Sequence, residues 1–456
     1  MLSCDTMAVA AQFTRWNQNM LAKNSDRPTA EAQTLHVYPA QQYAEGATVQ
    51  MTDLCIPQVS STYAVIGSQP YWTWGFEMGM NEKGLIIGNE AQGSKNAAEA
   101  ETGILGLDLL RLALERAATA REGVDVITGL LEKYGQNANA SQLIDRRYEN
   151  AYLLVDKNEI WLLETAGREW AAKRVEARIG ISNCYQISEQ FDLCSAGAEE
   201  RARCMRWLAP DEPFHFAKAY TKPAIRQTGS VPRMRRLNQL LAKTDCHDYS
   251  SLSAILRDHF DGEITEPRFG AVMGCFSTIC MHMREWGESE TTASIVSRID
   301  EVLGVVSRYA MGQPCQSVYL PVYATGYLPA KLQDGGKQWS ETSLWWKCKR
   351  MSLLASVDEE RFAPALMQNL RALEQALNQQ AETVEKQAAA LLQEGQKAEA
   401  FRLLNEMMDS AAAQAETLVE AESARIASAI RELGGLYGVQ AENIARYAEY
   451  AQMPQL

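Results

Sequence analysis

The chain has 456 residues, of which 46% are hydrophobic and 22% are charged, and its formal net charge at pH 7 is -13. Such a composition is ordinary for a soluble globular protein, and the acidic balance argues against a nucleic-acid binder, which needs a basic face. No run approaches the ~20 apolar residues of a membrane helix, and no signal peptide is recognisable. We therefore expect a cytoplasmic protein with neither a nucleic-acid nor a membrane partner.

The chain contains ten cysteines and five histidines, which are scattered. There is no CxxC pair and no HExxH motif, and the spacing lacks the paired pattern of a structural zinc site. The sequence therefore predicts reduced cysteines, no metal and no cofactor. Cys280 and His282 could form a catalytic dyad, but the apolar stretch from Phe276 to Met283 favours an inert, buried thiol.

In the first half of the chain, short apolar runs separated by turn formers predict strands up to about residue 100. These runs are Met7–Ala11, Tyr63–Gly67 and Gly84–Gly88. An apolar period near 3.6 predicts a helical region from Ile104 to Tyr134. Three further strands are expected at Asn150–Val155, Ile160–Thr165 and near Trp170–Val175.

In the second half, a helical region is expected over 232–260, strands over 270–283 and 290–298, and a strand pair from Cys315 to Pro321 onward. After about residue 355, Ala, Glu, Gln and Leu dominate, and a leucine stripe predicts long helices. Its members are Leu366, Leu370, Leu373 and Leu377. We expect a main domain over 4–354 and a helical extension over 355–456. Packing onto the main domain is favoured for these helices, and a homo-oligomer formed through them is the alternative.

The chemistry of the N-terminal region centres on Cys4. A hairpin with strands Met7–Phe13 and Met20–Lys23 would bring Lys23 and Asp26 beside this thiol. A nearby cation, Lys23 or Arg27, would lower the thiol pKa. If residues 1–3 were removed, the α-amine of Cys4 could act as its base, with Asp26 holding the ammonium form.

Several segments, in order along residues 3–350, give this chain a family resemblance. The run YWTWGFEMGMNEKG at 71–84 is similar to the secernin pattern W-x-W-G-x-E-M-G-x-N-E-x-G. Matching segments follow at 87–91, 106–112, 161–167, 181–183, 280–282 and 343–346. The chain resembles the secernin and dipeptidase branch of peptidase family C69, which comprises N-terminal-nucleophile cysteine hydrolases related to bile salt hydrolases and penicillin V acylases.

The resemblance implies an α+β fold, a four-layer αββα sandwich, with the helical C-terminal extension added to it. It implies that Cys4 is the nucleophile and that Asp26 binds the α-amine. Lys23 takes the position that arginine occupies in bile salt hydrolases. Because lysine is a point charge and not a rigid fork, its contacts are expected to differ.

The resemblance also assigns oxyanion and supporting roles. Asn183 corresponds to the asparagine that supports the oxyanion, and Asn89 is a second candidate for that role. Arg233 corresponds to a late catalytic arginine, although Arg235 and Arg236 are alternatives.

Two residues are candidates for binding substrate. Arg27 would hold a substrate carboxylate, as a dipeptidase requires, or only pair with a nearby acid. Trp72 would form a pocket wall, although core packing is favoured for a tryptophan.

The expected function is amide hydrolysis of dipeptides or small peptides through a Cys4 thioester, after removal of residues 1–3. Methionine removal alone would stop at the bulky Leu2, so autoprocessing of the Ser3–Cys4 bond or a second protease is needed. The alternatives are an N-acyl amide hydrolase, or a non-hydrolytic, secernin-like protein with a modified N-terminal cysteine. A scaffold whose C-terminal helices recruit a partner is a further reading.

Overall fold

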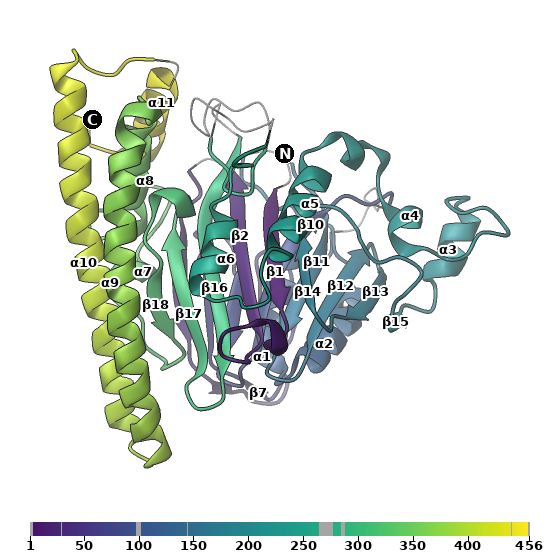
Figure 1. Ribbon diagram of the computed structural model, residues 1–456. Coiled ribbons are helices and arrows are strands. Elements are labelled where there is room, and N and C mark those ends of the chain that lie inside the picture. The colour runs from purple at the N-terminus through teal and green to yellow at the C-terminus, as the bar shows by residue number, and fades with distance from the viewer. Residues whose placement is uncertain are drawn as a thin grey trace.

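The computed structural model describes residues 3–28, 30–96, 102–143, 145–263, 277–283, 288–438 and 440–454. Two antiparallel sheets form its centre (Figure 1). The six-stranded sheet has the order β14 (Arg178–Ile181), β1 (Cys4–Val9), β2 (Met20–Pro28), β16 (Ser289–Asp300), β17 (Gly304–Met311) and β18 (Leu320–Tyr323).

The eight-stranded sheet lies against the first, with β1 and β2 contacting β10 and β11. Its order is β15 (Leu193–Cys194), β13 (Glu169–Arg174), β12 (Ile160–Ala166), β11 (Glu149–Val155), β10 (Ile86–Gln92), β9 (Met78–Asn81), β8 (Val65–Pro70) and β3 (Gln33–Tyr38). Two small ribbons pair β4 (Gln41–Gln42) with β7 (Ser61–Thr62) and β5 (Thr48–Gln50) with β6 (Cys55–Pro57).

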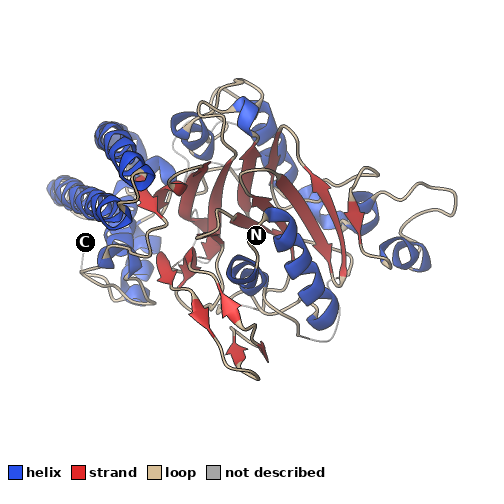
Figure 2. Cartoon of the chain, turned by 90° about the horizontal axis from the view of Figure 1, so that it is seen from below, coloured by secondary structure: helices blue, strands red, loops and turns tan. Residues whose placement is uncertain are grey.

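Helices cover the outer faces of both sheets, as Figure 2 shows. On the eight-stranded sheet lie α1 (Gly106–Arg116) and α2 (Ala120–Tyr134), and on the six-stranded sheet lie α5 (Ser230–Leu241) and α6 (Tyr249–Leu256). Shorter helices are α3 (Ala198–Cys204), α4 (Phe216–Tyr220) and α7 (Ala330–Gln333). The four-layer αββα sandwich expected from the sequence is confirmed.

The central hairpin is buried along its whole length. Every residue of β1 and β2 is buried, because the second sheet covers one face and helices cover the other. Polar side chains in these strands therefore need buried partners, since an unpaired polar group in such a place costs folding free energy. This requirement shapes the site around Cys4.

The C-terminal region adds α8 (Leu344–Ala355), α9 (Glu359–Gln393), α10 (Lys397–Glu432) and α11 (Ala441–Ala451). The long α9 and α10 form a hairpin that packs on β18 and α8. Leu366, Leu370 and Leu377 of the predicted stripe are fully buried in a core shared with the sandwich. These leucines are thus covered within one chain. Among the described residues, no helix combines the length and the apolarity needed to cross a membrane.

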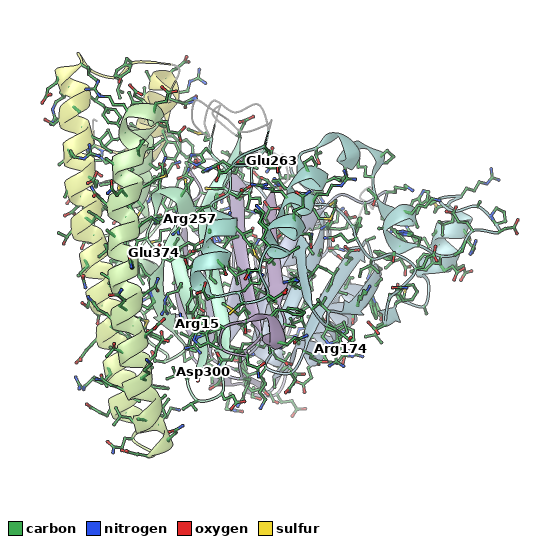
Figure 3. All side chains as sticks on the ribbon, viewed as in Figure 1. Arg15, Arg174, Arg257, Glu263, Asp300 and Glu374 are labelled. Carbon is green, nitrogen blue, oxygen red and sulfur yellow. The ribbon has the colours of Figure 1, made fainter. Side chains whose placement is uncertain are left out.

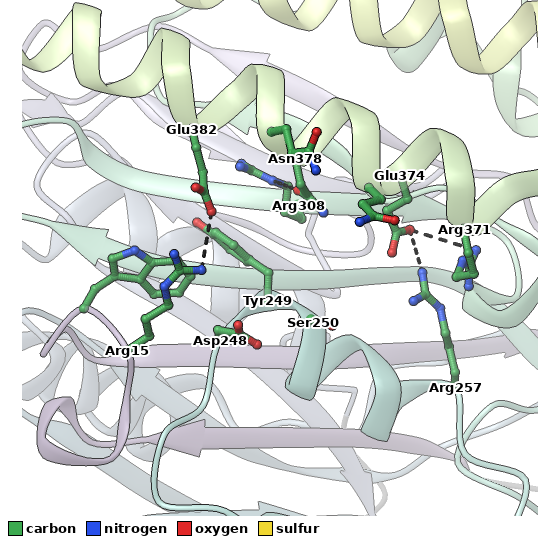
Figure 4. A pocket seen from close by; sticks show the side chains of 13 residues that line it. Arg15, Asp248, Tyr249, Ser250, Arg257, Arg308, Arg371, Glu374, Asn378 and Glu382 are labelled. Atoms are coloured by element: carbon green, nitrogen blue, oxygen red, sulfur yellow. Dashed lines mark hydrogen bonds and ion pairs between the residues drawn. The ribbon is translucent and has the colours of Figure 1, made fainter.

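Ion pairs fasten α9 to the sandwich. Arg257, just after α6, lies 2.6 Å from Glu374 of α9, and both are labelled in Figure 3. A cavity of about 380 Å³ beside this contact is lined by charged side chains of α9 and of the sandwich (Figure 4). Arg371 and Arg257 both face Glu374 there, which places two cations at this seam.

The two helical regions expected from the sequence are confirmed, but each is divided into two helices. The region 104–134 holds two helices, because Asn81 donates to the carbonyls of Leu114 and Ala117 and ends α1, while Thr119 caps α2. The region 232–260 also holds two helices, α5 and α6.

Residues 277–283 form no strand, and the rest of the expected strand over 270–283 lies outside the described residues. Residues Pro314–Gln316 form a 3-10 turn, so only β18 remains of the strand pair expected there.

Candidate active site

The expected hairpin joins β1 and β2, with Cys4 opposite Ser25 and Thr6 opposite Lys23. The first strand, β1, begins and ends earlier than the expected Met7–Phe13, whereas β2 begins at Met20 as expected and runs on to Pro28. The main-chain N–H of Asp26 donates to Cys4 Sγ over 3.3 Å. Lys23 and Asp26 therefore lie on the strand next to Cys4.

Cys4 begins β1 and is only 4% exposed. Its main-chain nitrogen donates to Asn183 Oδ1 over 3.0 Å, and its carbonyl accepts from Ser182 Oγ over 3.3 Å. Burial raises the pKa of the thiol well above its ordinary value, although the Lys23 ammonium acts in the opposite direction. Burial at this position therefore favours the neutral thiol of Cys4 over its thiolate.

Lys23 is fully buried between the sheets. Its Nζ lies 3.8 Å from Glu90 Oε1 and 3.9 Å from Glu77 Oε2. Burial disfavours the ammonium, but Cys4 and the neighbouring carboxylates outweigh it and raise the pKa of Lys23 above its ordinary value. Lys23 is therefore a permanent positive charge near the thiol.

Asp26 offers one occupied and one free carboxylate oxygen. Thr291 Oγ donates to Oδ1 over 2.6 Å, whereas the buried Oδ2 makes no hydrogen bond with the described residues. Burial raises the pKa of Asp26, and Arg233 and the Thr291 hydroxyl oppose that rise. A free buried acceptor next to Cys4 could receive an ammonium N–H.

Arg233, on α5, is the arginine of the basic cluster that reaches the site. Its Nη2 donates to Asn183 Oδ1 over 2.7 Å and to Ser182 Oγ over 2.9 Å, and its Nε lies 3.3 Å from Asp5 Oδ2. Of the two alternatives, Arg235 is exposed and Arg236 is ion-paired with Asp258.

Asn183 differs in orientation from the expected oxyanion donor. Its oxygen accepts from both Cys4 N and Arg233, while its Nδ2 donates to the Ala91 carbonyl over 2.8 Å. Two donors on one side fix the carboxamide with its oxygen toward Cys4. The side chain therefore positions the main-chain nitrogen of Cys4 and presents no N–H to that side.

Asn89, the second oxyanion candidate, lies on β10 between Asn150 and Glu77. With Nδ2 turned toward Glu77, its amide donates to Glu77 Oε2 and to the Glu77 carbonyl, each over 2.9 Å. It does not line the cavity at Cys4. Asn89 therefore contacts Glu77, which lines the cavity with Cys4.

Of the two roles left open for Arg27, the structure shows the pairing with nearby acids. Arg27 is 4% exposed, and it donates to Glu31 Oε2 over 2.7 and 2.9 Å and to Glu77 Oε1 over 3.0 Å. Two carboxylates thus already neutralise its guanidinium. Trp72 is half-buried and does not line the cavity.

A narrow cavity of about 20 Å³, room for about one water, opens beside Cys4. Its other lining residues are Ser3, Asp26, Arg27, Pro28, Glu77, Ala91, Arg146 and Tyr148. Because Ser3 is part of this wall, removing the residues before Cys4 would enlarge the cavity at the thiol.

Several site residues were not singled out from the sequence: Asp5, Glu77, Glu90, Arg146, Tyr148 and Thr291. Glu77 stands inside the quoted motif at 71–84, so its position could have been noticed. Arg146 and Tyr148 lie in a loop with no recognisable motif. The Arg146 side chain makes no hydrogen bond or ion pair with the described residues, and burial together with the nearby Arg27 charge lowers its pKa.

Comparison with known proteins supports the family resemblance. Residues 4–228, just under half of the chain, match the model of peptidase family C69. It is 29% identical over 239 residues to a dipeptidase of Bifidobacterium longum (strain NCC 2705), covering 46% of this chain and 42% of the relative. It is 26% identical over 222 residues to a probable dipeptidase A of Streptococcus pyogenes serotype M18 (strain MGAS8232), covering 43% and 44%. The matched part is thus less than half the length of these relatives.

Solved structures similar to this chain include a variant of conjugated bile acid hydrolase from Clostridium perfringens and penicillin V acylase from Agrobacterium tumefaciens. The first has a TM-score of 0.39 and 13% identity, and covers 68% of this chain and 89% of its own. The second has a TM-score of 0.39 and 15% identity, and covers 71% and 86%.

Proposed function

We propose that this chain is a cysteine hydrolase that cleaves dipeptides or small peptides through a Cys4 thioester, once residues 1–3 are removed. The observation that carries the proposal is that Cys4 N and Cys4 Sγ each contact a residue that has a buried acceptor oxygen. Asn183 Oδ1 accepts from this nitrogen over 3.0 Å, and the free Asp26 Oδ2 belongs to the residue whose N–H contacts Cys4 Sγ. An α-amine at this atom would be oriented by both side chains.

The α-amine then acts as the base of the reaction. It takes the proton of the Cys4 thiol, and the thiolate attacks the carbonyl carbon of the scissile amide. The permanent charge of Lys23 stabilises the thiolate. The ammonium returns the proton to the leaving amine as the C–N bond breaks, which leaves a thioester on Cys4. Water, deprotonated by the same amine, hydrolyses this thioester and restores the thiol.

Arg146 is the cation that fits the recognition of a substrate carboxylate. It lines the cavity with Cys4 and makes no ion pair with the described residues, whereas the neighbouring Arg27 is bound to two glutamates. An unpaired guanidinium at a cavity mouth is suited to bidentate binding of a carboxylate. A free carboxylate is a feature of dipeptides, and two relatives carry the name dipeptidase.

An N-acyl amide hydrolase is the second candidate, because the same thioester chemistry cleaves any accessible amide. An N-acyl amide hydrolase predicts that a free carboxylate on the substrate contributes little to substrate binding. A non-hydrolytic protein with a modified Cys4 is the third candidate, and it predicts an altered mass at the N-terminus and no turnover.

The test begins with intact-protein mass spectrometry, which reports whether the chain begins at Cys4. Hydrolysis of a dipeptide panel and of N-acyl amino acids follows, with Cys4→Ala as the inactive variant. Cys194→Ser is the matched control, because Cys194 is a half-buried thiol in the outer strand β15. Retention of Ser3 together with full activity would contradict the amine-base mechanism. Equal activity of Cys4→Ala and the unaltered chain would remove Cys4 from the reaction.

A further inference from the structure

Four side chains that the proposed reaction does not use converge on one point beside the six-stranded sheet. They are His259, Cys280, His282 and Cys315, and we call them the Cys2His2 cluster. His282 Nε2 lies 3.3 Å from His259 Nε2, 3.1 Å from Cys315 Sγ and 3.8 Å from Cys280 Sγ. All four donor atoms lie within 4.8 Å of one another.

The three separations from His282 Nε2 are compatible with three edges of a small tetrahedron. Zinc binds imidazole nitrogen at about 2.0 Å and thiolate sulfur at about 2.3 Å, so the edges of its tetrahedral site are roughly 3.3 to 3.8 Å long. The observed separations of 3.1, 3.3 and 3.8 Å fall in or close to this range. Two thiolates and two imidazoles are a donor set that suits zinc.

The backbone around the ligands is held by contacts other than the ligands themselves. Cys280 N donates to the Asp258 carbonyl, which ties the segment of Cys280 to the residue before His259. Arg236 binds the Asp258 carboxylate with two hydrogen bonds of 2.7 and 3.0 Å. On the other side, Arg257 Nε donates to the Pro314 carbonyl over 2.9 Å, next to Cys315. The ligand geometry is therefore prearranged by the fold.

The other ring nitrogen of His282 supports the same reading. His282 Nδ1 lies 3.6 Å from Glu359 Oε1, at the start of α9. A metal-binding histidine commonly presents its second nitrogen to a carboxylate, which fixes the tautomer and makes the ligating nitrogen a better donor. With Nδ1 facing Glu359, the lone pair of Nε2 faces the centre of the cluster.

We propose that the Cys2His2 cluster binds one zinc ion as a structural site. Four protein ligands fill a tetrahedral shell and leave no open position for water or substrate, which is the arrangement of structural and not catalytic zinc. Cys280 is fully buried, and the cluster shares no residue with the cavity at Cys4. On binding, the two thiols lose their protons to solvent, and the two thiolates balance the charge of Zn²⁺.

The site connects to Cys4 through one short path. Met281, between two ligands, donates its N–H to Thr291 Oγ over 2.9 Å, and this hydroxyl donates to Asp26 Oδ1 over 2.6 Å. The zinc would thus hold in place the segment that positions the Thr291 hydroxyl. The ion orders the wall of the site at Cys4 and takes no part in the reaction.

The experiment measures metal content of the full-length chain after reconstitution with Zn²⁺ and removal of free ion. We expect about one zinc per chain in the unaltered protein and in the Cys194→Ser control, and a loss of nearly all bound zinc in Cys315→Ser. Glu359→Gln should keep the zinc but weaken its binding roughly 10- to 100-fold in chelator competition.

Cobalt substitution of the unaltered chain gives a readout that needs no variant to fold. Bound Co²⁺ should show thiolate charge-transfer absorption and the intense visible bands of a tetrahedral site. An unaltered chain that holds no zinc and gives no such spectrum overturns the proposal. It is also overturned by a cobalt spectrum that is identical in Cys315→Ser, or by a Cys280–Cys315 disulfide in place of metal in the unaltered chain.

Discussion

Two buried sites in this chain are built around cysteine, and their surroundings differ in kind. Cys4 is surrounded by ionisable groups of both signs, with Lys23, Arg233, Asp26 and Glu90 all buried near it. The Cys2His2 cluster instead brings neutral or soft donors to one point. A nucleophile needs charges that stabilise a changing ionisation state, whereas a cation needs lone pairs aimed at it. The same residue type is thus given opposite tasks by its neighbours.

The largest expected effect is on hydrolysis, and it leaves the zinc content unchanged. Cys4→Ala should lower hydrolysis on the order of a thousand-fold or more, because it removes the nucleophile. Its zinc content should equal that of the unaltered chain, since no ligand is touched. Steady-state kinetics and elemental analysis on one preparation measure both. A loss of zinc in Cys4→Ala would mean that Cys4 itself helps to hold the ion.

Removal of the zinc ion should lower the stability of the folded chain, whether or not Cys4 is present. A zinc ion present at about 100 times its dissociation constant stabilises the folded state by about 3 kcal/mol. A strong chelator should therefore lower the unfolding temperature of the unaltered chain and of Cys4→Ala by similar amounts. Cys315→Ser should show no response to the chelator in differential scanning fluorimetry. An equal fall in the unfolding temperature of Cys315→Ser would mean that the chelator does not act through the Cys2His2 cluster.

A third change probes recognition at the charged site. Arg146→Ala should raise KM for dipeptides with a free carboxylate by about 10- to 100-fold. This range follows because a hydrogen bond to a charged group contributes about 1.5–3 kcal/mol. The kcat should change little, and amidated dipeptides should be unaffected. Arg147→Ala is the matched control, because Arg147 is exposed and paired with Asp145. If Arg146→Ala and Arg147→Ala have the same KM for dipeptides, Arg146 does not bind the substrate carboxylate.

The smallest effect tests the path between the sites. Thr291→Val keeps the shape of the side chain but removes the hydroxyl that lowers the pKa of Asp26. With that hydrogen bond gone, the already raised pKa of Asp26 rises further, so its carboxylate is protonated at a higher pH. The acid limb of the kcat/KM profile should move to higher pH, with a modest loss of rate at its plateau.

Thr292→Val is the control for this change, because the Thr292 hydroxyl contacts Gln33 and Ser25 and not Asp26. If Asp26 acts as proposed, zinc removal should shift the same limb in the same direction, through Met281 and Thr291. An unchanged acid limb in Thr291→Val would exclude Asp26 from the ionisations that limit the rate.

The family resemblance predicted the sandwich, whereas local signals predicted many of its strands and the hairpin. Turn formers and short apolar runs set the strands, and the Lys23 to Pro28 segment is near Cys4 in the chain. For Arg27 the sequence left two roles open, binding a substrate carboxylate or pairing with a nearby acid. The charge of Arg27 is taken by Glu31, only four residues on, and by Glu77 from the other sheet.

The Cys2His2 cluster could not be predicted from the sequence, because its members are not all close together in the chain. His259 and Cys315 are 23 and 33 residues away from His282, and only Cys280 is near it in the chain. Its ligands come from the loop after α6, from the segment before β16 and from the turn after β17. Only the packing of these segments brings the donors together, so no spacing rule could find them.

The position of Glu359 has a practical consequence for how the C-terminal hairpin is studied. A chain cut at residue 355 would lose the carboxylate beside His282 and uncover the sandwich surface that Leu366 and Leu370 pack against. Loss of binding to another protein after such a truncation would report misfolding as readily as a missing contact surface. Charge reversals at Arg402 and Glu406, whose side chains are exposed on α10, leave the core intact and test the outer face alone.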